Sequence, residues 1–184
     1  MKIVDIEKVC KNGMEIIRTD IENKEKKVER VFLGTDDAQF AVDRKLWLTP
    51  EAYLDLFGVY GKMVDKYYTE WEIAEDEEAE FYLDNYPGEI ECFPLGIKIA
   101  YGDILWQPFR TIENKIFFIP EKWIASVDFE DGMTLLYVRE NFLAIKKGLY
   151  LEGLIKIPLP VFEDRLDEMI TNLIKLANAI KTKE

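Results

Sequence analysis

The sequence contains no histidine, and this absence removes several classes of functional site. Without imidazole there is no His-ligated zinc, no two-His-one-carboxylate iron centre and no Cys–His or Ser–His catalytic pair. Serine is nearly as scarce, because Ser126 is the only one and it lacks the flanking glycines of a nucleophile elbow. The commonest forms of nucleophilic catalysis are therefore excluded.

Cysteine and glutamine are also rare. Cys10 and Cys92 are the only cysteines, too few for a disulfide framework or a closed zinc site, so we expect two reduced thiols in a cytoplasmic protein. Gln39 and Gln107 are the only glutamines, while Lys and Glu dominate the charged residues. This bias is typical of growth at high temperature, and we expect a thermophilic source.

Long apolar runs are missing as well. The longest candidate, residues 135–145, is interrupted by Arg139 and Glu140, whereas a membrane helix needs about 20 apolar residues. The N-terminal residues do not contain the uncharged core of a secretory signal. We therefore expect a soluble, intracellular protein with no membrane partner.

The residues that are present describe an acidic globular chain. Its 184 residues are 48% hydrophobic and 33% charged, which is typical of one folded domain and predicts a single domain over residues 1–184. The formal net charge of −12 disfavours nucleic acid as a partner, because a binder needs Lys and Arg to replace phosphate counterions.

The hydrophobic pattern predicts an α+β fold, mainly an antiparallel sheet with a central helical segment and a C-terminal amphipathic helix. Residues 1–48 read as a β meander, residues 49–86 as helical, and residues 87–184 as further strands followed by the last helix. Within the central segment, Thr69 and Glu72 form a potential capping box that starts a second helix running to residue 85.

Two further elements are predicted in the last part of the chain. Residues 123–129 and 133–138 flank the turn signal at Gly132 and predict a hairpin. The C-terminal helix has an apolar stripe at helical spacing. Its members are Phe162, Leu166, Met169, Ile170, Leu173, Ala177 and Ile180.

The densest charge feature is an acidic segment interleaved with aromatic residues. Like-charge blocks are usually solvated helix faces, but such a surface also speeds association with a basic partner. We predict a non-catalytic protein-binding or regulatory module whose partner has a basic surface. The candidate binding residues are Glu70, Trp71, Glu72, Glu75, Asp76, Glu77, Glu78, Tyr82 and Tyr86.

Two alternative functions stay open. One is a carboxylate-based enzyme that depends on a divalent metal, with Asp36, Asp37 and Asp128 as candidate ligands, since Mg²⁺ and Ca²⁺ prefer carboxylate oxygens. Asp36 and Asp37 are equally typical of a turn. The other is a nucleic-acid-mimicking inhibitor that uses its acidic surface. No cofactor motif is present, and we assign neither a catalytic residue nor a cofactor.

Aromatic residues are more numerous between residues 49 and 86 than one helix stripe needs. Tyr68, Tyr82 and Tyr86 have no evident place on the stripe, and tyrosine is favoured at interfaces because its ring buries area while its hydroxyl finds a polar partner. We therefore predict a homodimer or a larger closed oligomer.

Overall fold

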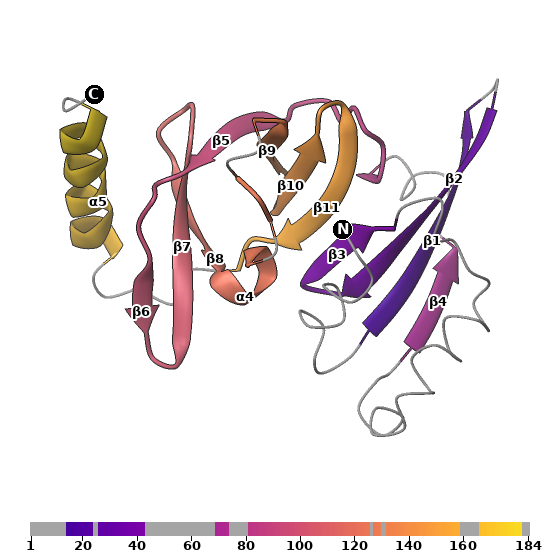
Figure 1. Ribbon diagram of the computed structural model, residues 1–184, viewed down its shortest axis with the longest axis horizontal. Helices are drawn as coiled ribbons and strands as arrows, with labels where there is room; N and C mark the ends of the chain where they lie inside the picture. Colours follow the sequence, from indigo (N-terminus) through magenta and orange to yellow (C-terminus); the bar gives the residue numbers. More distant parts are fainter. Residues whose placement is uncertain are drawn as a thin grey trace.

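A computed structural model describes residues 14–23, 26–42, 69–73, 81–125, 127–129, 132–158 and 166–181. Within these residues run eleven strands and two helices (Figure 1). The strands are β1 (Met14–Asn23), β2 (Lys26–Thr35), β3 (Ala38–Ala41), β4 (Thr69–Ile73), β5 (Ile90–Pro94), β6 (Ile99–Tyr101), β7 (Ile104–Thr111), β8 (Ile116–Pro120), β9 (Thr134–Arg139), β10 (Phe142–Lys147) and β11 (Tyr150–Lys156). The helices are α4 (Glu121–Ile124) and α5 (Leu166–Lys181).

The strands form one continuous, mostly antiparallel arrangement. Their order is β4-β1-β2-β3-β11-β10-β9-β5-β7-β6, and β8 pairs with β7. The pairing of β1 with β4 is parallel, and every other described pairing is antiparallel. β5 joins the two parts of the sheet, because Ile90 and Glu91 pair with β9 whereas residues 92–94 pair with β7 (Figure 1).

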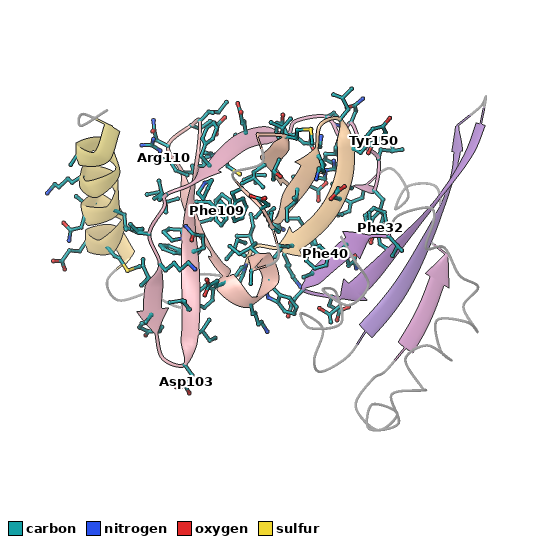
Figure 2. All side chains as sticks on the ribbon, viewed as in Figure 1. Phe32, Phe40, Asp103, Phe109, Arg110 and Tyr150 are labelled. Carbon is teal, nitrogen blue, oxygen red and sulfur yellow. The ribbon has the colours of Figure 1, made fainter. Side chains whose placement is uncertain are left out.

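The main apolar core lies between these two parts of the sheet. Phe40 of β3, Leu143 of β10 and Ile155 of β11 contribute from one side, and Phe109 of β7 contributes from the other. Trp123 and Ile124 of α4 belong to the same cluster. Figure 2 shows Phe40 and Phe109 directed toward this interior. Period-two alternation places the apolar side chains of each strand on the buried face, which explains why one core unites strands distant in sequence.

The expected α+β class is wrong, because the described chain is mainly antiparallel β-sheet. Its helices do not form layers: α4 is a single turn, and α5 contacts the sheet through Met169 and Leu173 among its described side chains. Of the expected stripe, the structure describes the contacts of Met169 and Leu173, and Phe162 lies outside the described residues. Residues 49–68, which carry the expected first central helix, lie outside the described residues.

Two local predictions are also wrong. The second helix expected from Thr69 is instead strand β4, whose residues pair in register with β1 from Met14 to Arg18. The strand expected over residues 123–129 begins instead in helix α4, where Trp123 is buried. In both places long-range packing prevailed over the local pattern. The division into one domain stays a prediction.

Candidate functional site

Arg139 is the most deeply buried charged side chain in the described part of the chain. It stands at the end of β9, and its guanidinium donates from Nε to Glu89 Oε1 at 2.8 Å, with a second bond from Nη2 to the same oxygen. Its Nη1 donates to the backbone carbonyl of Phe81. The rings of Phe81 and Tyr86 lie over the guanidinium, with centroids at 5.8 and 5.0 Å. A planar charge that donates from three nitrogens and lies over aromatic rings distinguishes arginine from lysine here.

Glu89 is shared between two cations. While Arg139 occupies Oε1, the ammonium of Lys146 on β10 donates to Oε2, and all three side chains are almost fully removed from solvent. The Lys146 ammonium also lies 4.8 Å from the ring centroid of Tyr137. A buried pair of this kind contributes little net stability, but removal of one member leaves an uncompensated buried charge at a cost of about 3–5 kcal/mol.

The residues held by this cluster form a segment that crosses the outer face of β9, β10 and β11. We call residues 81–88 the strap. Tyr82 packs on Phe32 at 5.0 Å between ring centroids and donates to Gln39 Oε1 at 3.0 Å. Asp84 Oδ1 accepts the backbone N–H of Leu151 at 2.6 Å. The strap is thereby attached to β2, β3, β9 and β11 by directional contacts.

Aromatic side chains of the strap form a layer against the sheet. Phe81 meets Tyr82, Tyr86 and Phe142 edge to face or nearly so, with centroid separations between 5.1 and 5.8 Å. This is the favoured geometry for rings whose edges are positive and faces negative. The Tyr86 hydroxyl donates to the Glu140 carboxylate. The apolar residues below this layer are Phe32, Ala144, Leu151 and Leu154.

The predicted binding residues fall into three groups. Glu70, Trp71 and Glu72 belong to β4, at one end of the described strand order. The run Glu75, Asp76, Glu77 and Glu78 lies outside the described residues. Tyr82 and Tyr86 belong to the strap and are half-buried against the sheet.

The candidate metal ligands do not converge. Asp36 and Asp37 are exposed in the tight turn between β2 and β3, where the Asp37 N–H donates to Thr35 Oγ1 at 3.3 Å. Asp128 is exposed between α4 and β9. In the part of the chain that the structure describes, no three His, Cys, Asp or Glu residues are grouped closely enough to hold a metal ion.

Cys92 is a structural thiol in the main core. It is buried on β5, and burial, reinforced by the nearby Glu91 carboxylate, raises the pKa of its thiol to about 12. Because the thiolate is the nucleophile, this thiol is unreactive at neutral pH. Burial together with Glu91 and Glu89 also raises the pKa of the Tyr137 hydroxyl.

Sequence reasoning missed two groups of exposed apolar side chains, one at each of two hairpins in different parts of the sheet. Tyr101 and Ile104 stand at the tip of the β6–β7 hairpin, and Leu149 and Tyr150 stand at the turn between β10 and β11. Figure 2 shows Asp103 at the first tip, at the bottom, and Tyr150 at the top. The available signal was Gly148 followed directly by two large apolar residues, where a hairpin turn ordinarily carries polar ones.

No protein-family model, curated protein or solved structure matches this chain. Among the described helices, none is long and apolar enough to cross a membrane.

Proposed function

We propose that this protein is a non-catalytic binding or regulatory module whose partner is a protein with a basic surface. One observation carries the proposal: the acidic segment is attached to the sheet at both ends. It begins in β4, which pairs with β1, and it continues into the strap, which Arg139 holds at Phe81. Seven residues, 74–80, connect these two fixed points and include all four carboxylates of the run from Glu75 to Glu78.

Such an arrangement suits recognition for a physical reason. Binding residues work best when a rigid scaffold supports them, because less conformational freedom is lost on association. The chain as a whole carries a formal net charge of −12, and a field of this sign accelerates encounter with basic surfaces. The closely spaced carboxylates then provide local charge complementarity.

The cysteine that the structure describes is not a candidate nucleophile. The buried Cys92 thiol has its pKa raised to about 12 and is therefore a poor nucleophile. The proposal places the protein in the cytoplasm, where a reducing environment keeps such a thiol unpaired.

The test compares two variants that lose the same number of negative charges. The first neutralises the run through Glu75→Gln, Asp76→Asn, Glu77→Gln and Glu78→Gln. The control neutralises four exposed carboxylates elsewhere through Asp36→Asn, Asp37→Asn, Asp103→Asn and Glu113→Gln. Titration calorimetry with a Lys/Arg-rich peptide measures both, beside co-purification from the native host at low salt.

The first variant is expected to lose peptide affinity while the control retains most of it. Equal losses of peptide affinity in the two variants would mean that binding depends only on the net charge of the chain, which contradicts the proposal. Recovery of the chain without any basic protein from the native host would do the same.

A further inference from the structure

Both ends of the strap meet at one guanidinium. Arg139 donates from Nη1 to the carbonyl of Phe81, the first residue of the strap. It donates from Nε and Nη2 to Oε1 of Glu89, the residue that directly follows the strap. The ring centroid of Tyr86 lies 5.0 Å from the same guanidinium. A segment of this length whose ends lie together is a compact loop, and here a single buried side chain closes it.

The closed loop carries two of the predicted binding residues. Between its ends, Tyr82 donates to Gln39 and Tyr86 donates to Glu140, and both tyrosines are half-buried. The sequence suggested these tyrosines for contact between copies of the chain. In the structure they are engaged within the strap, and the oligomer stays a prediction.

The loop is also continuous with the acidic run. Glu78 precedes Phe81 by three residues in the sequence. The point at which Arg139 holds the Phe81 carbonyl is therefore also the point to which the run is tied. Arg139 itself is fully buried, so it influences binding only through the residues that it holds.

We propose that Arg139 is a positioning residue of the binding surface: it closes the strap and so fixes the strap tyrosines and the adjoining end of the acidic run before a partner arrives. This inference rests on the proposed function. A surface that is ordered in advance loses less conformational freedom on association, and each side chain that must be immobilised costs affinity. Removal of Arg139 opens the loop and transfers that ordering to the binding step.

Charge alone predicts the opposite result. Loss of one arginine takes the formal net charge of the chain from −12 to −13, and a more negative chain attracts a basic peptide more strongly. A positioning role predicts weaker binding in spite of the added negative charge. The sign of the change in affinity therefore separates the two effects.

The test measures the Kd of a Lys/Arg-rich peptide for the full chain by titration calorimetry, at a temperature where circular dichroism shows every variant folded. Arg139→Leu opens the loop, and Arg139→Lys keeps the charge but lacks the planar group that reaches both ends. Arg110→Leu, on β7 and partly exposed, makes the same change in net charge as Arg139→Leu. Leu143→Ala destabilises the buried core instead and controls for lost stability.

Both substitutions of Arg139 are expected to raise the Kd, and Arg139→Leu should raise it at least about fivefold. Arg110→Leu should bind the peptide as tightly as the wild type or more tightly, and Leu143→Ala should keep the wild-type Kd. If Arg139→Leu does not fold, the triple variant Arg139→Met/Glu89→Leu/Lys146→Met replaces it, because no unpaired buried charge remains in the cluster. The same loss of affinity is expected of this variant.

Three results would each overturn the proposal: equal affinity in Arg139→Leu and Arg110→Leu, an equal loss of affinity in Leu143→Ala, or full affinity in Arg139→Lys. A wild-type chain that does not bind the peptide contradicts the proposed function and this inference together. If the wild type binds, neutralising the run abolishes binding, and Arg139→Leu binds normally, the inference alone fails.

Discussion

The two faces of β9, β10 and β11 are covered in different ways. The inner face packs Leu136, Leu143 and Ile145 against β7 and α4 with apolar contacts. The outer face carries Arg139 and Lys146 on the same strands and is covered by the strap. Apolar burial is non-directional and tolerates volume-conserving exchange. Buried ions require particular partners, and we infer that they specify where the strap lies.

The largest expected effect comes from removing one member of the ion cluster. Arg139→Leu leaves Glu89 with one cation and the Phe81 carbonyl without its donor, so we expect the free energy of unfolding to fall by about 3–5 kcal/mol. Urea denaturation at neutral pH measures it. Arg110→Leu, on β7 and partly exposed, is the matched control and should change stability far less.

A triple variant sharpens the same comparison. Replacing Arg139, Glu89 and Lys146 together by Met, Leu and Met removes every member of the cluster, so no unpaired charge remains. Its free energy of unfolding should lie close to that of the wild type. If the ions fix the position of the strap, proteases should cut the strap faster in the triple variant than in the wild type. A triple variant as unstable as Arg139→Leu would show that the ions themselves stabilise the fold.

On the inner face, Leu143→Ala creates a cavity in a fully buried site. We expect a loss of about 2–5 kcal/mol in the free energy of unfolding. Leu105→Ala, at a leucine on β7 that is substantially exposed, provides the control and should cost much less. Comparable losses at the two leucines would contradict the assignment of Leu143 to the core.

The inner face should also respond to alkaline pH through Cys92. Folding raises the pKa of this thiol from 9.0 to about 12, so above pH 9 the unfolded chain releases a proton that the folded chain retains. Stability therefore falls as pH rises, by up to about 1.4 kcal/mol per pH unit between these values. In a Cys10→Ala background, the free energy of unfolding of the chain with Cys92 should fall by this amount relative to that of the Cys92→Val variant. If the difference between the two does not change with pH, the thiol is not buried.

The smallest effect tests a single hydrogen bond of the strap. Tyr82→Phe removes the hydroxyl that donates to Gln39 but keeps the ring on Phe32. We expect a loss of about 1 kcal/mol in the free energy of unfolding. In the double variant with Gln39→Leu, the loss should be less than the sum of the two single losses. Additive losses would mean that the two groups do not interact.

The sequence-based predictions succeeded where structure depends on local alternation. The β meander expected over residues 1–48 contains the observed β1, β2 and β3, and the strand expected over residues 133–138 lies close to β9. Arg139 and Glu140 were interpreted as an interruption of an apolar run. They in fact end β9, with Glu140 at a φ of +51° in the turn to β10, and the arginine is buried. Composition could not reveal this, because its partner Glu89 is 50 residues away.

By itself, the sequence determined the acidic character, the absence of imidazole chemistry, and the strands whose side chains alternate. Each follows from residue identity or from the two-residue period of a strand. Only the tertiary structure decided that Thr69 begins a strand, that Trp123 lies in a helix, and that the strap is held by Arg139. Those outcomes depend on pairing and burial between residues far apart in the chain, and such contacts outweigh local propensities of a few tenths of a kcal/mol per residue.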